Sequence, residues 1–316
     1  MRVLVTGGAG FLGQHVCRLL GEGGHEAVSL DLKPSLAASL SIEGSVLDEA
    51  SFEAAGKVDA VIHAAALTHL WRRDVRDFRR VNLGGTVQAA RHAARHDARF
   101  VYVSSYTVHG GKGLPPVVAE DDLPRPGTLF GPYAQSKRAA ETALRELLPK
   151  AVVVRPSALI GPGGGAETPP MRMLGAIARG ELPGTMKGRI DVADVRDVAA
   201  GVVSALLKGG EARDYLLTGH DLTLAAFSQK VAKAAGQKPP KILAPPAAAL
   251  MAAHVEELIG KLTGREPQAV TAGVRMAALS SCFSPARAEA ELGYRRRPLG
   301  ESITDALASL GHSAEA

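Results

Sequence analysis

Cysteine and aromatic residues are scarce in this chain of 316 residues. Its two cysteines, Cys17 and Cys282, lie far apart and lack the spacing of metal ligands, so neither a disulfide framework nor a metal site is predicted, and a reducing compartment is favoured. Aromatic residues make up 4% of the chain, whereas alanine and glycine are abundant. This balance favours helices that pack closely against a sheet.

Two kinds of segment are also missing. No apolar run reaches the length of a membrane span, and no signal peptide precedes the first expected strand, so we expect a cytoplasmic protein without an integral membrane segment. The arginines, as in Arg72-Arg73, are not interleaved with aromatic residues. The net charge is +5. We therefore interpret the basic residues as lying on solvated faces of the protein and expect no nucleic-acid partner.

The composition that remains is that of a globular protein, with 46% apolar and 22% charged residues. In the first half, apolar strands alternate with helices, which predicts a parallel sheet covered on both faces. The expected strands are Arg2–Thr6, Glu26–Asp31, 60–65, 99–104 and 151–155. The expected helices are 11–20, 49–55, 77–96 and 134–147. The predicted fold class is α/β, a Rossmann-type doubly wound sheet with a smaller α/β C-terminal domain.

The second half is less regular. Beyond one strand at 215–218, the expected helices are 171–179, 197–207, 224–235, 247–262, 284–292 and 301–310. Residues 1–165, with about 190–218, are expected to bind a dinucleotide, and about 166–189 with 219–316 to bind a substrate. The segment 247–262 is rich in alanine and apolar, and we favour a lid or core helix over contact with a membrane surface.

A glycine loop follows the first strand and opens the first helix. Gly8, Gly10 and Gly13 match G-x-G-x-x-G, and Gly7 extends the match to T-G-x-x-G-x-x-G. Glycines let backbone N–H groups approach a pyrophosphate at a helix N-terminus. Asp31 follows at the end of the second strand, where a carboxylate accepts ribose hydroxyls and repels a 2′-phosphate. NAD is therefore favoured over NADP, although Lys33 lies close and leaves NADP open.

Tyr133 and Lys137 are four residues apart in an expected helix, so they share one face. A phenol beside an ammonium is a proton-transfer pair, because the charge of Lys137 favours the phenolate and lowers the pKa of Tyr133. The alternative interpretation is a half-buried helix tyrosine and a solvated lysine. The glycine loop upstream favours the catalytic interpretation.

Further motifs follow in order along the chain. They are AVIHAAA at 60–66, VNLGGT at 81–86, YVSS at 102–105, VRPS at 154–157, DVADV at 191–195 and LGY at 292–294. With the glycine loop they resemble the extended short-chain dehydrogenase/reductase family, the NAD-dependent epimerase/dehydratase group, over nearly the whole chain. Ordered motifs at the expected spacing are more specific than any one alone.

This resemblance implies roles for individual residues. Tyr133 is the acid/base, Lys137 tunes it and binds the ribose, and Ser105, counted back from Gly110, shares the substrate oxygen. Asn82 completes the implied catalytic set. The implied cofactor residues are Gly7, Gly10, Phe11, Leu12, Gly13, Asp31, Ser45, Val46, Ala64, Ala65, Ala66, Ser104, Tyr133, Lys137, Pro156 and Ser157. The substrate contacts are predicted to be Thr68, Trp71, Tyr106, Thr107, His109 and Arg172.

The chain departs from the family pattern in three places. Gly44-Ser45 stands where the family often has Gly-Asp, which weakens the expected adenine contact. Tyr106-Thr107 replaces the Asp-Glu of dehydratases, so the groups that eliminate water are missing. His109 replaces the tyrosine of a Val-Tyr-Gly motif of epimerases, and a substrate contact and a packed loop histidine are equally good interpretations.

Two reactions within the family compete. We favour net interconversion of a secondary alcohol and a ketone, as in the 3β-hydroxysteroid dehydrogenase and dihydroflavonol reductase branch, over nucleotide-sugar 4-epimerisation with bound NAD. Arg172 is one cation among prolines and methionines, which suits a bulky apolar substrate such as a sterol, terpenoid or β-hydroxy acid, although core methionines are an equal alternative. A catalytically silent NAD(P)-binding protein is a third possibility. The family resemblance also implies a homodimer through the long helices near 87–96 and 134–147.

Overall fold

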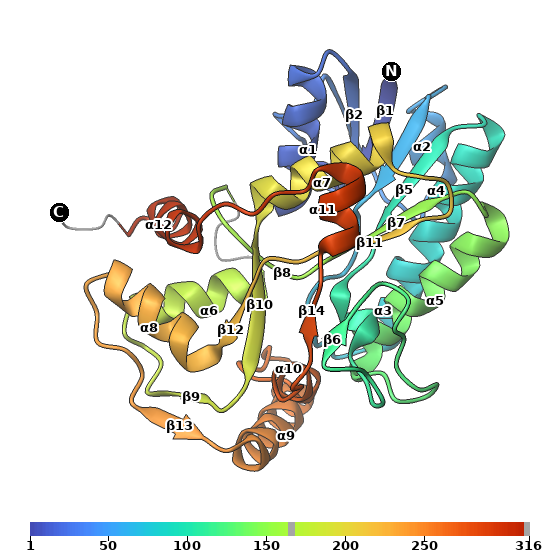
Figure 1. The fold of residues 1–316 in the computed structure, drawn as a ribbon. Helices are drawn as coiled ribbons and strands as arrows, with labels where there is room; N and C mark the ends of the chain where they lie inside the picture. Colours follow the sequence, from blue (N-terminus) through green and yellow to red (C-terminus); the bar gives the residue numbers. More distant parts are fainter. Residues whose placement is uncertain (164–167, 313–316) are drawn as a thin grey trace.

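A parallel sheet of seven strands forms the centre of the molecule (Figure 1). The computed structural model describes residues 1–163 and 168–312. The strand order is β3-β2-β1-β4-β5-β7-β11, so the chain winds outward in both directions from the boundary between β1 and β4. The strands are β1 (Arg2–Thr6), β2 (Glu26–Asp31), β3 (Leu40–Glu43), β4 (Ala60–His63), β5 (Arg99–Val103), β7 (Val152–Pro156) and β11 (Asp214–Leu217). The predicted doubly wound α/β fold is confirmed.

Helices cover both faces of this sheet. Figure 1 shows α1 (Phe11–Glu22) and α7 (Val195–Lys208) on one side, and α4 (Gly84–Arg95) and α5 (Gly131–Leu147) on the other. The short helix α2 (Glu49–Glu53) joins the second layer through Phe52.

The strand sequences explain why both faces are covered. Along β1, Val3 and Val5 enter the core that α1 and α7 share, while Leu4 enters the core beneath α4 and α5. All three are fully buried. Side chains alternate between the faces of a strand, so an unbroken apolar run requires a cover on each side.

The expected helix at 77–96 is wrong as a single element. The structure has α3 (Arg76–Phe78), a π-helical turn (Arg79–Leu83) and then α4. The π turn contains the buried Asn82, whose side chain bonds the backbone of Leu67. A π turn inside an α-helix is characteristic of a functional site.

Beyond the main sheet lie further short strands, most of them two to four residues long and absent from the expected strands because such runs carry little periodic signal. A three-stranded sheet combines β8 (Ala158–Ile160), β10 (Arg189–Asp194) and β12 (His220–Thr223). Two further strand pairs are β9 (Gly184–Met186) with β13 (Ile242–Ala244), and β6 (Val117–Val118) with β14 (Cys282–Phe283). The helices are α6 (Pro169–Ala178), α8 (Leu224–Ala234), α9 (Pro246–Thr263), α10 (Thr271–Ala277), α11 (Ala286–Leu292) and α12 (Leu299–Ser309).

The chain returns to the main sheet more than once. After β10 it passes through α7 into β11, and near the C-terminus α11 packs against both α7 and β11. The first boundary of the expected division into two domains, at residues 165 and 166, lies outside the described residues, and the division with its further boundaries near 190 and 218 stays a prediction.

The structure overturns one of the two roles expected for helix α9, that of a core helix, and leaves the lid a prediction. Only Ala253 and Gly260 of its residues are buried, so it is not a core helix. Among residues 1–163 and 168–312, no helix is long and apolar enough to cross a bilayer.

The two glycines of α1 provide a matched test of close approach. In Gly13→Ala the new Cβ would lie 1.9 Å from the Gly7 carbonyl oxygen, so the loop must move and the free energy of unfolding should fall by about 1–3 kcal/mol. In Gly21→Ala the Cβ meets nothing, and the gain in helix propensity should stabilise the protein by about 0.5–1 kcal/mol. Urea unfolding measures both, and equal effects would contradict the close approach.

Candidate active site

The glycine loop lies against the end of β4. Gly7 has φ of +73°, and a Cβ on it would approach the Ala65 nitrogen to 2.8 Å. Gly13 sits over Gly7, as the contact of 1.9 Å described above shows. These three residues therefore bring the first helix close to the edge of the sheet, and only glycine fits at Gly7 and Gly13.

The start of α1 presents backbone donors that have no partner among residues 1–163 and 168–312. Gly10 is the N-cap and no side chain caps the helix, so the N–H groups of the first turn have no partner within it. Asp31 lies beside this turn, since its Oδ2 accepts a hydrogen bond from the Ala9 nitrogen at 3.1 Å. Bare N–H groups and a helix N-terminus suit a pyrophosphate, and the adjacent carboxylate suits ribose hydroxyls.

The other predicted cofactor residues gather at the same edge of the sheet. They lie just after the carboxyl ends of β3, β4 and β5 and at the end of β7. In chain order they are Ser45, Val46, Ala64, Ala65, Ala66, Ser104, Pro156 and Ser157. Backbone bonds hold this edge in place, including Ser104 N to Val154 O at 2.8 Å and Ala64 N to Thr6 O at 3.1 Å. Their contact with a cofactor stays a prediction.

The predicted catalytic trio is brought together by β5 and α5. Ser105 follows β5, and its Oγ accepts hydrogen bonds from Thr107 N at 3.2 Å and Thr107 Oγ1 at 3.0 Å, which caps the short turn Tyr106–His109. Tyr133 and Lys137 lie one turn apart on α5, and both are buried. The alternative of a solvated Lys137 is therefore wrong.

The expectation that Lys137 lowers the pKa of Tyr133 is also wrong for this structure. Burial raises the pKa of Tyr133 to about 12, and the neighbouring Ser105 hydroxyl opposes this only in part. The ring of Phe78 packs edge-on against Tyr133 at 6.3 Å between centroids. The phenol is thus a proton donor at neutral pH.

The ammonium of Lys137 is held away from water. Its Nζ donates to the Val103 carbonyl oxygen at 2.8 Å and lies 4.8 Å from the centroid of the Tyr102 ring. Burial lowers the pKa of Lys137 to about 7, and the charge of Glu141 opposes that shift. A lysine of this pKa can exchange a proton near neutral pH.

Asn82 acts on the site through other residues. Its Oδ1 accepts from Leu67 N at 2.8 Å, and its Nδ2 donates to Ser136 Oγ at 2.9 Å. Ser136 Oγ in turn donates to the Tyr133 carbonyl oxygen at 2.7 Å. This chain of bonds ties the loop after β4 to the turn of α5 that carries Tyr133, and the catalytic role of Asn82 stays a prediction.

His63 is a buried residue that the sequence analysis did not assign. Its Nδ1 lies 2.7 Å from Thr6 Oγ1, and its ring stacks on Tyr102 with 5.9 Å between centroids. Burial, together with the charge of Lys137, lowers the pKa of His63 to about 3, so the ring is neutral. It fills the space between β1 and Tyr102, behind Lys137.

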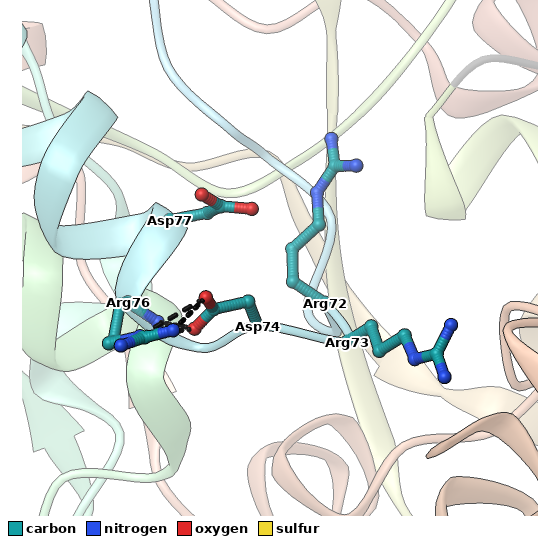
Figure 2. Close-up of a pocket in the computed structure, with 5 residues that line it drawn as sticks. All are labelled: Arg72, Arg73, Asp74, Arg76 and Asp77. Carbon is teal, nitrogen blue, oxygen red and sulfur yellow. Dashed lines mark hydrogen bonds and ion pairs between the residues drawn. The ribbon is translucent and has the colours of Figure 1, made fainter. Parts of the chain in front are cut away.

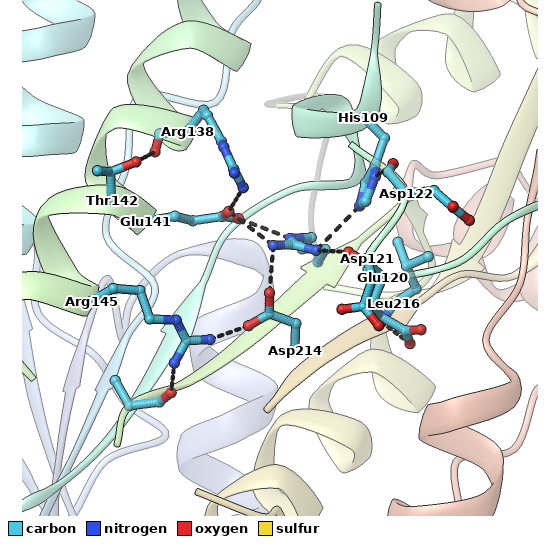
Figure 3. Close-up of polar contacts among 12 residues, drawn as sticks. His109, Glu120, Asp121, Asp122, Arg138, Glu141, Thr142, Arg145, Asp214 and Leu216 are labelled. Atoms are coloured by element: carbon cyan, nitrogen blue, oxygen red, sulfur yellow. Dashed lines mark hydrogen bonds and ion pairs between the residues drawn. The ribbon is translucent and has the colours of Figure 1, made fainter. Parts of the chain in front are cut away.

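A buried ion network lies behind the trio. Figure 3 shows Glu141 and Asp214 converging on one guanidinium, which belongs to Arg155. Its Nε and Nη2 are each 3.0 Å from the Glu141 carboxylate, and Nη2 is 2.7 Å from Asp214. Glu141 lies one turn beyond Lys137 on α5, so the network holds the catalytic helix against β7 and β11. The VRPS motif contains Arg155, but nothing in it indicated this partner.

The side chain of His109 is buried next to Arg155 of this network and is not exposed at the protein surface. Its Nδ1 lies 2.9 Å from the Asp122 carbonyl oxygen and its Nε2 lies 3.4 Å from Arg155. It is fully buried, and burial beside Arg155 lowers its pKa to about 4. The structure corrects the predicted substrate contact in favour of the packed loop histidine.

The remaining predicted substrate residues form two groups. Tyr106 and Thr107 adjoin Ser105, and the Tyr106 ring meets Phe283 edge-on at 5.2 Å. The second group lies by α9, where a Cβ on Gly260 would come within 3.1 Å of the Trp71 ring. Thr68 is exposed on the same loop.

Arg172 is not a free cation. Its Nη1 and Nη2 donate to Glu266 at 2.8 and 2.9 Å, and His69 Nδ1 lies 2.7 Å from the same carboxylate. These hydrogen bonds, led by that from Arg172, lower the pKa of Glu266 to about 2. The prediction that Arg172 meets a substrate is therefore weakened, since its charge is already neutralised.

A surface hollow of about 570 Å³ lies along the loop between β4 and α3 (Figure 2). It is lined by Arg72, Arg73, Asp74, Arg76 and Asp77. Figure 2 shows Arg72 and Arg73 extending away from the bonded pair of Asp74 and Arg76. None of the predicted catalytic residues lines it, so it is separate from the trio.

Comparison with known proteins agrees with this geometry. Residues 3–217 match the model of the NAD dependent epimerase/dehydratase family. The chain belongs to that family. The match spans the glycine loop, the trio and β11, which are the parts described above.

Two members of the family are similar over most of their length. One, from Synechocystis sp., is provisionally named dihydroflavonol 4-reductase, and is 30% identical over 96% of this chain and 92% of its own. The other is a 3 beta-hydroxysteroid dehydrogenase/Delta 5-->4-isomerase of Mycobacterium tuberculosis, 28% identical over 93% of this chain and 85% of its own.

Solved structures share the fold. The crystal structure of gox2253 has a TM-score of 0.83 at 28% identity, covering 98% of this chain and 97% of that one. A UDP-glucose 4-epimerase from Thermotoga maritima has a TM-score of 0.77 at 20% identity, covering 98% and 99%. An identity of 20% indicates the architecture alone.

An NAD-binding family implies a dinucleotide, and the residues present fit one. The cradle at Gly7 and Gly13 has no room for side chains, and the first turn of α1 offers unpaired N–H groups beside Asp31. These residues would hold the pyrophosphate and the adenosine ribose, and Lys137 lies at the carboxyl end of β5 on the same edge of the sheet. When bound, the nicotinamide supplies a hydride acceptor or donor.

Removing the buried charge tests the surroundings of Lys137. Between pH 7 and 10.5 the unfolded chain binds a proton that folded Lys137 has lost, so the contribution of Lys137 to stability rises with pH in this window. Relative to wild type, Lys137→Met should therefore be most stable below pH 7 and lose that advantage toward pH 10.5. Loss of the bond to Val103 adds only a constant offset.

Urea unfolding across that pH window measures the difference. Lys230→Met, which removes an exposed lysine, is the control and should give a difference independent of pH. A pH-independent difference for Lys137→Met as well would contradict the buried charge.

Proposed function

We propose that this protein is an NAD(P)-dependent oxidoreductase that interconverts a secondary alcohol and a ketone on a bulky apolar substrate. The observation that carries the proposal is the grouping of Ser105, Tyr133 and Lys137 at the sheet edge that also holds the glycine loop. The glycine loop and the trio both lie at the carboxyl ends of the parallel strands. In open α/β sheets, ligands bind in the crevice at these ends.

The chemistry follows from the states of these groups. The raised pKa of Tyr133, about 12, keeps the phenol protonated, so it donates to a carbonyl oxygen as hydride reaches the adjacent carbon. Ser105 lies beside it and donates a second hydrogen bond to the same oxygen. Lys137, with a pKa lowered to about 7, replaces the proton on the phenol. Oxidation of the alcohol runs through the same steps in reverse.

Two observations support an apolar substrate over a nucleotide-sugar. Arg172 is already bonded to Glu266, so it is not available to a diphosphate. Beside Ser105, the Tyr106 ring packs edge-on against Phe283, so the nearest neighbours of the serine on this side are aromatic. The relatives named for dihydroflavonol and 3 beta-hydroxysteroid chemistry point the same way.

Nucleotide-sugar 4-epimerisation is the second candidate. The family description names epimerases, and a solved UDP-glucose 4-epimerase has a similar fold. A catalytically silent NAD(P)-binding protein is the third. We also propose that NAD is preferred over NADP because of Asp31, and that two copies associate through α4 and α5.

Tyr133→Phe tests the mechanism. It should bind NADH as the wild type does but lose at least about 100-fold in kcat, because the proton donor is gone. Tyr294→Phe is the matched control, since the buried Tyr294 hydroxyl has no hydrogen-bond partner among the described residues. Fluorescence titration with NADH and single-turnover kinetics measure the two effects. Unchanged turnover in Tyr133→Phe would refute the mechanism. A wild-type protein that binds NADH but shows no turnover would favour the third candidate, the catalytically silent NAD(P)-binding protein.

A substrate panel separates the reactions. The protein is incubated with NAD and hydroxysteroids, β-hydroxy acids or UDP-sugars, and NADH absorbance is followed. We expect stoichiometric NADH from an apolar alcohol, whereas epimer formation without net NADH would favour the second candidate. In the same assay NADP should work less well than NAD, because Asp31 repels its 2′-phosphate. A clear preference for NADP would contradict that argument.

A further inference from the structure

Helix α9 is oriented opposite to an ordinary surface helix, with its carboxylates toward the protein. Glu257 Oε1 accepts hydrogen bonds from Thr271 N and Oγ1 at 2.7 and 2.9 Å, at the start of α10. Glu256 Oε2 accepts from Gln268 N at 3.4 Å. A surface helix of a water-soluble domain normally turns apolar residues inward and charges outward.

The outward face of α9 is an apolar stripe. Its large side chains are between 46% and 75% exposed, and they are Met251, Val255, Leu258, Ile259 and Leu262. At the helical repeat they fall within an arc of about 100°. The strand β13, which directly precedes α9, adds exposed Ile242 and Leu243. A contiguous exposed apolar surface of this kind marks an interaction site.

Positive charge borders the stripe. In the segment 238–265 the exposed ionic side chains are all cations, namely Lys238, Lys241, Lys261 and Arg265, and no carboxylate of this described segment is exposed. Arg73, from the hollow in Figure 2, also reaches the end of α9, since a Cβ on Gly264 would lie 3.8 Å from its Nη1. The apolar stripe and the cationic border together match an anionic, apolar partner.

We propose that α9 docks on an anionic lipid surface, with the apolar stripe in the interface and the cations at the headgroups. Such binding adds burial of apolar area to attraction by anionic lipids. A second copy of the chain fits less well. An isologous contact would pair this patch with itself, so its cations would face a surface on which the described segment 238–265 exposes no carboxylate.

The docking helix is joined to the loop that is expected to meet the substrate. Trp71 packs under Gly260, and Glu266, just after α9, binds His69 of the same loop and Arg172 of α6. An apolar substrate dissolved in the lipid would thus leave the lipid surface next to Trp71. This last step rests on the proposed function, whereas the docking itself does not.

Sedimentation with vesicles tests the docking. Wild-type protein should pellet with equimolar phosphatidylcholine and phosphatidylglycerol, more weakly with phosphatidylcholine alone, and less at high salt. The variant L258S/L262S should partition about 100-fold less, about tenfold for each side chain removed. The variant K261Q/R265Q should lose about fivefold per charge on the anionic vesicles only. L36S, which removes a fully exposed leucine elsewhere, should pellet as the wild type does.

The outcomes are distinct. Wild-type protein that stays in the supernatant, or L258S/L262S that still pellets, would overturn the proposal. Loss of an oligomer in L258S/L262S by light scattering, without an effect of vesicles, would identify a second copy as the occupant. Thermal unfolding confirms that each variant is folded. Tyr133→Phe should pellet normally, so failure of docking and failure of the proposed reaction are separable.

Discussion

Arg155 carries a positive charge into the interior, where it is 1% exposed, and its partners come from segments far apart in the chain. Glu141 belongs to α5, Asp214 to β11, and the Glu120 carbonyl, at 2.8 Å, to the loop before α5. Breaking a buried ion pair by removing one partner costs about 3–5 kcal/mol, because the other charge is left uncompensated. The placement of α5 on the sheet therefore depends on this guanidinium.

The position of Lys137 in the candidate site depends on the placement of α5. Lys137 lies one turn before Glu141, so the helix that Arg155 holds also sets the distance from the ammonium to Val103. The glycine loop is placed independently, by the contact of Gly7 with Ala65 at the end of β4. Two separate constraints thus converge on one edge of the sheet, where we propose that the dinucleotide binds.

Most strands and helices of the first half could be predicted because apolar periodicity and glycine spacing are local signals, whereas the short strands β3 and β6 were missed. The interruption at Asn82 could not, because its π turn is stabilised by bonds to Leu67 and Ser136, which the helix pattern does not contain. His109 illustrates the same limit within the site. Its position in a motif suggested a substrate contact, but its partners, Asp122 and Arg155, are known only from the fold.

The sequence by itself determined the fold class, the glycine cradle and the spacing of Tyr133 and Lys137, because each depends on residues close together in the chain. Tertiary structure alone decided the protonation states of the pair, since burial raises one pKa and lowers the other. It also decided which face of α9 meets water. A helical pattern shows two faces, and the burial of Ala253 and Gly260 together with the bonds of Glu256 and Glu257 to neighbouring backbone turns the apolar stripe outward.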